Sequence, residues 1–143
     1  MSAIIELIKI LRERTGAGMM DCKKAIEENN GDIEKAVDWL REKGITKAAK
    51  KASRIAAEGL TDVRMDDASQ KAIILEVNCE TDFVAKGEGF TKLVHDVRDT
   101  VLKLNPGCID CAREGVASLF TDATVKMGEK LELRRFEIVK ANP

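Results

Sequence analysis

The sequence predicts an α+β fold with a three-helix bundle at its N-terminus, a linker helix, and a small antiparallel sheet of about three strands with packed helices. Three observations support this prediction. Short apolar stripes with helical spacing fill residues 3–44. From Gly59 the apolar period changes to two, which is typical of strands. A longer helical stripe begins at Phe90, and the chain ends in another alternating segment.

The N-terminal bundle is predicted from three amphipathic patterns, within residues 4–11, 19–26 and 33–40. The stretch "TGAG" at 15–18 interrupts the first helix. The stretch "NNGD" at 29–32 ends the second helix and offers Asp32 as the N-cap of the third. Gly44 is expected to end the third helix. We therefore predict a first domain over residues 1–44.

A basic, alanine-rich segment follows the bundle. No acidic residue lies between Glu42 and Glu58, and alanine favours helix, so we predict a basic linker helix over residues 45–58. Its lysines have no aromatic residues between them, and the whole chain has a net charge of −1. These properties favour a solvated helix face, or contact with an acidic protein patch, over direct binding of nucleic acid.

Residues 59–143 are expected to form an α+β core. Every second residue from Ile73 to Cys79 is apolar or a thiol, which predicts one buried strand face, and "LTDVRM" is the expected partner strand across the turn "DDAS". A helix over residues 90–104 should stop at Asn105-Pro106-Gly107, and another is expected over 116–127. In the last strand the alternation slips near Arg134, which predicts a bulge.

No combination of residues indicates catalysis, a cofactor or a metal site. His95 lies inside a helical pattern, where a surface position is expected. Cys108 and Cys111 have the C-x-x-C spacing of redox motifs, but no βαβ pattern precedes them, and structural zinc takes four ligands. They are interpreted as loop cysteines. We therefore expect no enzyme activity, no cofactor and no bound metal.

The first residues, "MSAIIELIKILRERTG", form an amphipathic pattern that charged residues interrupt. Such a pattern predicts neither a signal peptide nor a membrane span. We expect a cytoplasmic protein without a membrane partner. In a reducing compartment its four cysteines are expected to be free thiols.

Two apolar motifs remain after the core is assigned. In "TGAGMMD", Met19 and Met20 follow a glycine-flanked bend, and at least one of them is expected at the surface as an adaptable contact. In "VNCETDFVAKGEGF", Phe83 shares the helical phase of Phe90, which favours burial. That argument requires a helix unbroken across Gly87 and Gly89. If the helix instead restarts near residue 88, Phe83 points outward.

Three stretches of the chain resemble bacterial translation elongation factor Ts. They are "LRERTGAGMMDCKKAIEENNGDIEKAVDWLREKGITKAAKKASRIAAEG", "VNCETDFVAKGEGF" and "MGEKLELRRF", in this order. The resemblance implies that residues 1–44 form a ubiquitin-associated-like domain and that residues 59–143 form a core of the dimerisation type. It also implies guanine-nucleotide exchange: the protein would bind elongation factor Tu, in its GDP-bound and nucleotide-free forms, and promote release of GDP.

The resemblance also implies which residues contact this partner. Asp82 and Phe83, flanked by Thr81 and Val84, would insert between helices of the GTPase domain and disturb its Mg²⁺–phosphate site. On this reading the Asp82–Phe83 pair is exposed. The N-terminal domain would contact another helix of the partner. The residues implied there are Arg12, Met19, Met20 and Lys23, with Lys51 of the basic segment.

This chain departs from the family in one respect, which is its short length. Relatives often carry a second core module or an insertion before the terminal strand, and here only residues 106–126 separate Asn105 from "MGEKLELRRF". Short relatives act as homodimers, so we expect self-association through a sheet edge or the last strand. Two other functions are considered. One is a binding adaptor that uses only residues 1–44. The other is a thiol oxidoreductase that uses Cys108 and Cys111.

Overall fold

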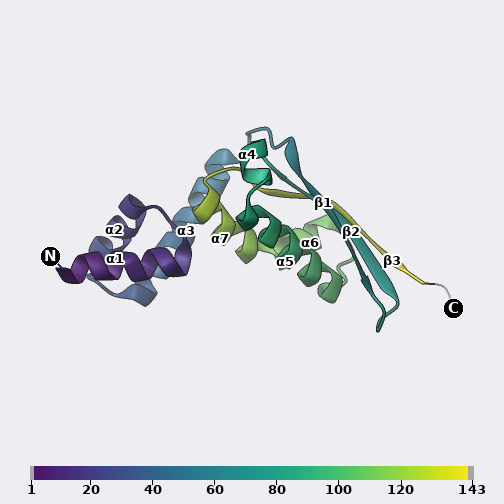
Figure 1. The fold of residues 1–143 in the computed structure, drawn as a ribbon, viewed down its shortest axis with the longest axis horizontal. Helices are drawn as coiled ribbons and strands as arrows, with labels where there is room; N and C mark the ends of the chain where they lie inside the picture. Colours follow the sequence, from purple (N-terminus) through teal and green to yellow (C-terminus); the bar gives the residue numbers. More distant parts are fainter. Residues whose placement is uncertain (1, 142–143) are drawn as a thin grey trace.

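The computed structural model describes residues 2–141 and has the predicted α+β fold, with a helical bundle joined to a small sheet that helices cover (Figure 1). The elements are α1 (Ser2–Thr15), α2 (Met19–Glu28), α3 (Ile33–Lys51), β1 (Glu58–Asp66), β2 (Lys71–Cys79), α4 (Asp82–Ala85), α5 (Glu88–Leu104), α6 (Ile109–Gly115), α7 (Ala117–Met127) and β3 (Glu132–Lys140).

Helices α1, α2 and α3 enclose their own small core. Its largest fully buried side chain is Leu11, which packs with Ile26 and Leu40 from the other two helices. The predicted N-cap of α3 is confirmed, because Oδ1 of Asp32 accepts a hydrogen bond from the backbone N–H of Lys35 at 3.2 Å. The apolar stripes of the sequence therefore face one another as expected.

The prediction that Gly44 ends the third helix is wrong, because α3 runs through Gly44 to Lys51. A Cβ at this position would lie 2.7 Å from Cγ2 of Val125 and 3.2 Å from the carbonyl oxygen of Thr121, both on α7. Glycine is thus required here for the close approach of two helices, and it does not mark a helix end. Through this contact α3 joins the bundle to the core (Figure 1).

The linker helix predicted over residues 45–58 is also shorter than expected, because helical structure ends at Lys51 and β1 begins at Glu58. Nζ of Lys130 donates hydrogen bonds to the carbonyl oxygens of Ala52 and Arg54, at 2.8 and 3.0 Å. These carbonyl groups therefore have partners outside a helix, which lets the chain turn toward the sheet. The division into domains at 1–44, 45–58 and 59–143 stays a prediction.

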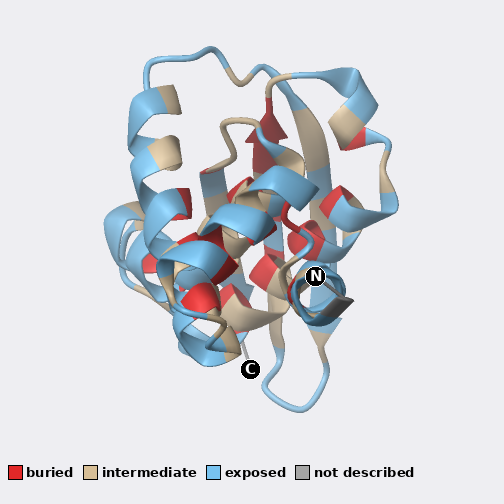
Figure 2. Ribbon diagram, turned by 90° about the vertical axis from the view of Figure 1, so that its left-hand side faces the viewer, coloured by how far each residue is buried: buried red, intermediate tan, exposed pale blue. Residues whose placement is uncertain are grey.

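The sheet is antiparallel with the order β1-β2-β3. The alternating face of β2 is buried as predicted, from Ile73 to Cys79. The predicted bulge is confirmed: Glu76 pairs with Arg135 whereas Val77 pairs with Leu133, so Arg134 is the extra residue on β3. Figure 2 shows the buried residues gathered where helices and sheet face each other.

Helix α5 packs across the sheet through a fully buried stripe that includes Phe90, Val97 and Val101. The helix stops at Asn105, which adopts the left-handed conformation with φ 49°. Leu104, the last residue of α5, lies outside the buried stripe and is 51% exposed. Its side chain lies over Gly115 of α6, because a Cβ at Gly115 would meet Cδ1 of Leu104.

Helix α6 has no counterpart in the prediction, and α7 matches the expected helix over 116–127. The α6 helix has only seven residues and no apolar stripe long enough to reveal it. Among residues 2–141, no helix combines the length and the apolar character needed to cross a membrane.

Candidate partner-binding site

The acid–aromatic motif forms a short exposed turn where β2 passes into α5. Its helix, α4, begins at Asp82, and Thr81 is the N-cap, whose hydroxyl accepts a hydrogen bond from the N–H of Val84 at 3.3 Å. Because Thr81 caps the helix, the carboxylate of Asp82 stays at the surface. It pairs there with Lys86, at an Oδ2–Nζ distance of 3.4 Å.

Phe83 is 87% exposed, the highest exposure among the large hydrophobic residues described. The other four aromatic residues of the chain are buried or half-buried. Phe83 does not share a continuous helix with Phe90, because α4 ends at Ala85 and α5 begins at Glu88. Exposure of the Asp82–Phe83 pair, which the resemblance implies, is confirmed. Ala85 is buried and Val84 packs against the core, so the turn that presents Phe83 is attached to the core from beneath.

A glutamate from a distant part of the chain fixes this turn. Oε1 of Glu129 accepts hydrogen bonds from the backbone N–H groups of Glu80 and Thr81, both at 3.1 Å, and Oε2 accepts one from the hydroxyl of Thr81 at 2.7 Å. A carboxylate that accepts bonds from backbone N–H groups makes charge-assisted hydrogen bonds, which are stronger than neutral ones. The residues just before Asp82 are therefore held in one conformation.

Glu129 is a site residue that the sequence analysis did not identify. It lies in "MGEKLELRRF", and its hydrogen bonds join this stretch to "CETDF" across 48 positions of the chain. Arg54, which follows the end of α3, contacts the same turn, because its Nη1 lies 3.3 Å from a carboxylate oxygen of Glu80. The turn is thus supported by the segment that precedes β3 and by the segment that follows α3.

Lys51 supports the same region. Its Nζ donates a hydrogen bond of 2.7 Å to the carbonyl oxygen of Gly128, one residue before Glu129. Burial lowers the pKa of the Lys51 ammonium, and the positive charges of Arg54 and Lys47 lower it further. Half-buried and engaged within its own chain, Lys51 stabilises the fold at this position.

The other predicted contact residues gather where α1 ends and α2 begins. Met19 is 59% exposed and Met20 is 71% exposed, so both methionines are at the surface. Arg12 and Lys23 are also exposed, and Lys23 lies 4.0 Å from a carboxylate oxygen of Glu27. In Figure 1, α2 and α4 both lie on the upper side of the molecule, one on the bundle and one on the core.

Comparison with known proteins gives a family model and a similar relative. The family model described as "Elongation factor TS" matches residues 80–143, which include the Phe83 turn, Glu129 and β3. Elongation factor Ts of Symbiobacterium thermophilum is 48% identical over 132 residues, which cover 92% of this chain and 43% of the relative.

The chain is similar to elongation factor Ts.

The chain spans less than half the length of the relative it matches, at 43%. The family model covers α4 and the core from residue 80 onward, while the similarity to the relative covers 92% of the chain. The activity and the partners of the whole protein are proposals. In this chain the motif residues are placed on two separate elements. The turn at Phe83 belongs to the core, and the methionine pair belongs to the bundle.

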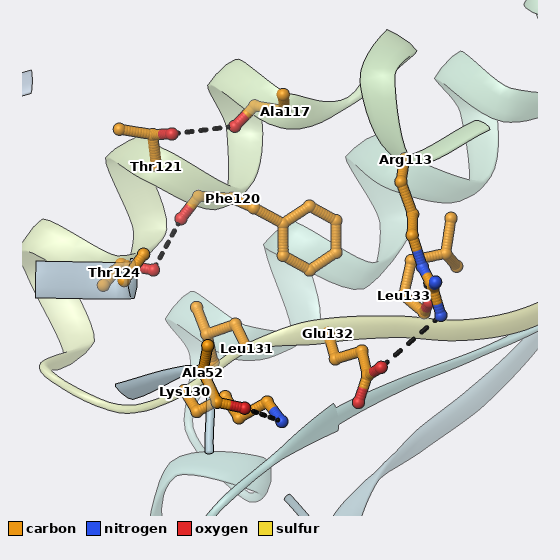
Figure 3. A pocket seen from close by; sticks show the side chains of 11 residues that line it. Ala52, Arg113, Ala117, Phe120, Thr121, Thr124, Lys130, Leu131, Glu132 and Leu133 are labelled. Carbon is orange, nitrogen blue, oxygen red and sulfur yellow. Dashed lines mark hydrogen bonds and ion pairs between the residues drawn. The ribbon is translucent and has the colours of Figure 1, made fainter. Parts of the chain in front are cut away.

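A groove of about 390 Å³ between the C-terminal half of α3, α7 and the start of β3 is distinct from these surfaces (Figure 3). Its two basic side chains already make contacts within the chain. Nε of Arg113 donates to the carbonyl oxygen of Leu133 at 3.0 Å, and Lys130 donates to carbonyl groups at the end of α3. The groove is therefore a place where elements are joined. Among residues 2–141, no three of the side chains His, Cys, Asp and Glu gather as metal ligands would.

Proposed function

We propose that this protein is a guanine-nucleotide exchange factor for elongation factor Tu, which promotes release of GDP during translation elongation by inserting Asp82 and Phe83 into the GTPase domain. The observation that supports the insertion is the 87% exposure of Phe83 on a turn that Glu129 and Thr81 fix. An exposed aromatic side chain on a rigid turn loses little conformational entropy when it enters a partner's pocket.

The free energy of burying Phe83 in the partner limits how far its insertion can weaken the binding of GDP. Burying an exposed Phe side chain stabilises a complex by about 1.5–3 kcal/mol. Weakening the partner's affinity for GDP tenfold requires about 1.4 kcal/mol of coupling, and coupling is reciprocal. Insertion of Phe83 thus accounts for roughly one to two factors of ten. Larger effects need further contacts, which Asp82, Thr81 and Val84 provide beside it.

The N-terminal bundle supplies the second contact in this proposal. Met19 and Met20 are flexible apolar side chains that adapt to an uneven surface, and Arg12 and Lys23 add positive charge beside them. Lys51 is the weakest member of the proposed contact set, because its ammonium group already binds the carbonyl oxygen of Gly128. We propose that Lys51 acts mainly by keeping the Glu129 segment in place.

The test is the rate at which elongation factor Tu releases a fluorescent GDP analogue in the presence of this protein. For Phe83→Ala we expect the stimulated rate to fall by roughly 10- to 100-fold, in line with the side chain's burial energy. Ile55→Ala is the matched control, because Ile55 is 83% exposed and lies outside the proposed contacts. It should leave the rate unchanged.

The outcome also separates this proposal from a binding adaptor. A folded Phe83→Ala variant with wild-type stimulation would contradict insertion. An adaptor that acts through the bundle alone would bind elongation factor Tu without accelerating release. Stimulated release by the unmodified protein is therefore the first requirement, and its absence would overturn the exchange function.

We also propose that the protein is a homodimer and that it works in the cytoplasm, where its partner acts. The apolar outer face of the sheet supports self-association. Val63, Met65, Ile74 and Val139 are all large hydrophobic residues with about half or more of their surface exposed on that face. The proposed partners include neither nucleic acid nor a membrane.

A further inference from the structure

Two exposed thiols lie together at the start of α6. Cys108 is the N-cap residue and Cys111 is in the first turn, and a hydrogen bond joins their sulfur atoms at a distance of 2.9 Å. The sulfur of Cys108 also accepts a hydrogen bond from the backbone N–H of Cys111 at 3.3 Å. Neither residue is among the proposed contacts with elongation factor Tu. Both lie between α5 and α7 in the chain, whereas Phe83 lies on α4.

The other two cysteines contrast with this pair. Cys22 and Cys79 are fully buried, in the bundle and under the sheet respectively. Burial, together with the negative charge of Glu129, raises the pKa of Cys79 to about 11. Buried thiols with a raised pKa are inert toward disulfides, because the thiolate is the reacting form. Only Cys108 and Cys111 combine exposure with a second sulfur in reach.

We propose that Cys108 and Cys111 form a thiol–disulfide exchange site whose substrates are accessible disulfides of small thiols. The inference does not depend on the proposed exchange of nucleotide. Cys108 is the attacking residue, because the backbone N–H of Cys111 donates a hydrogen bond to its sulfur and so stabilises its thiolate. Cys111 is the resolving residue, because its sulfur is already adjacent to the sulfur that it must attack.

The charge distribution agrees with these roles. The pKa of Cys108 is lowered because its thiolate accepts a hydrogen bond from the thiol of Cys111 and another from the N–H of Cys111. The pKa of Cys111 is raised by the same hydrogen bond and by the negative charge of Cys108. One thiol of the pair therefore ionises first, as an attacking thiol should, while the other keeps its proton until the second step.

The reaction proceeds in two displacement steps. The thiolate of Cys108 attacks one sulfur of the disulfide R–S–S–R, the S–S bond breaks, and R–S⁻ leaves and takes up the proton that Cys108 released to solvent. Cys111 then loses its proton and attacks the sulfur of Cys108, which expels the second R–S⁻, and this thiolate takes up that proton. Two electrons and two protons pass to the disulfide, and the protein keeps a Cys108–Cys111 disulfide.

The experiment exposes the full chain to oxidised glutathione and follows the products by mass spectrometry after acid quenching and alkylation. The wild type should lose two hydrogens, with Cys108 and Cys111 joined and no lasting glutathione adduct. Cys111→Ser should accumulate a mixed disulfide at Cys108. Cys108→Ser should react several-fold more slowly, at Cys111. Cys22 and Cys79 should stay unmodified, which also reports that each variant is folded.

A lone exposed thiol is the matched control. Ser118 is exposed on α7, so Ser118→Cys in the Cys108→Ser, Cys111→Ser background places one thiol at the surface without a neighbouring sulfur. At a ratio of oxidised to reduced glutathione that leaves the control thiol mostly reduced, the wild-type pair should be oxidised to the Cys108–Cys111 disulfide. Equal reaction rates of the two single variants and the control would overturn the proposal. Stable glutathione adducts or disulfides between chains in the wild type would also overturn it.

Discussion

The position of Phe83 depends on a single carboxylate. Glu129 accepts hydrogen bonds from two backbone N–H groups and one hydroxyl, all from Glu80 and Thr81. The hydroxyl of Thr81 in turn accepts the bond that caps α4. The conformation of an exposed four-residue helix is thus determined by a residue on the segment that leads into β3. Without Glu129, the donors before α4 would have only water as a partner.

We predict that Glu129→Gln destabilises the protein by roughly 1–3 kcal/mol, because an amide has one acceptor oxygen and its NH₂ group would face donors. Urea unfolding measures the loss. Hydrogen exchange should show faster exchange at the N–H groups of Glu80 and Thr81. Glu114→Gln, at an exposed position on α6, should stay within about 0.5 kcal/mol of the wild type. Unchanged protection at Thr81 in Glu129→Gln would contradict this role.

A second carboxylate makes the stability depend on pH. The pKa of Glu76 is lowered, because the amide of Asn78 donates a hydrogen bond of 2.9 Å to it and Arg135 donates another of 2.8 Å. A carboxyl group with a lowered pKa in the folded state contributes stability above its unfolded pKa of about 4.3. That contribution disappears as the pH falls through the folded value.

Glu76→Gln should therefore be less stable than the wild type at pH 7, and the difference should shrink as the pH falls below about 4.3. Urea unfolding of both proteins across this range measures it. Asp66 at the β1–β2 turn is a second carboxylate for comparison with Glu76. Its pKa is also lowered, chiefly by a hydrogen bond from the hydroxyl of Ser69. A difference between the wild type and Glu76→Gln that stays constant from pH 7 to acid would contradict the assigned role of Glu76.

Among the elements, α3 differs most from its prediction, and Gly44 explains the difference. A glycine after an amphipathic stripe usually marks a helix end, and here the same residue lets α3 and α7 touch. The sequence pattern cannot distinguish the two uses, because the second depends on Val125 and Thr121, which lie far along the chain. The strands, α5 and the bulge at Arg134 were predictable, since periodicity and turn residues determine them locally.

The candidate site divides in the same way. The N-cap role of Thr81 can be predicted from the sequence, because the cap involves only Thr81 and the three residues that follow it. The role of Glu129 cannot be predicted in this way, because its partners lie 48 and 49 positions away. Exposure of Phe83 depended on whether a helix crosses Gly87 and Gly89. Periodicity left that question open, and the resemblance to a family answered it. Helix α6 was missed because seven residues give too few positions for a stripe.

Gly44→Ala tests the contact between α3 and α7. In a helix interior, alanine is more favourable than glycine by up to about 1 kcal/mol. The Cβ of alanine would, however, be crowded against Val125 and the backbone of Thr121, which should destabilise the folded state by about 1–3 kcal/mol. We expect a net destabilisation of about 1–2 kcal/mol in urea unfolding. Gly107→Ala is the control, because a Cβ there meets nothing within 4 Å. A Gly44→Ala variant more stable than the wild type would show that α3 and α7 separate easily.

At the scale of the whole molecule, helices cover only one face of the sheet (Figure 1). On the other face Val63 lies opposite Ile74, and both Met65 and Val139 lie opposite Ala72. These side chains form a continuous apolar area across all three strands. Large exposed apolar areas on a protein surface commonly mark sites of protein–protein interaction. A second copy fits, because a two-fold axis would place each apolar area on its own equivalent.

The size of the sheet limits the strength of such a dimer. Each strand has nine residues, which span roughly 30 Å, and three strands are roughly 14 Å wide. The face is therefore smaller than the interface of about 800 Å² per partner that stable complexes commonly use. We expect a dimer that dissociates on dilution, measured by sedimentation over a series of concentrations.

Ile74→Glu should shift this equilibrium to the monomer. Ile74 lies on the central strand, so a two-fold interface would bring two buried carboxylates close together, and charges without partners are costly to bury. Ile10→Glu is the control, because Ile10 is 45% exposed on α1, in the bundle. It should leave the dimer intact. If Ile74→Glu sediments as the wild type does at every concentration, the outer face of the sheet is not where the copies meet.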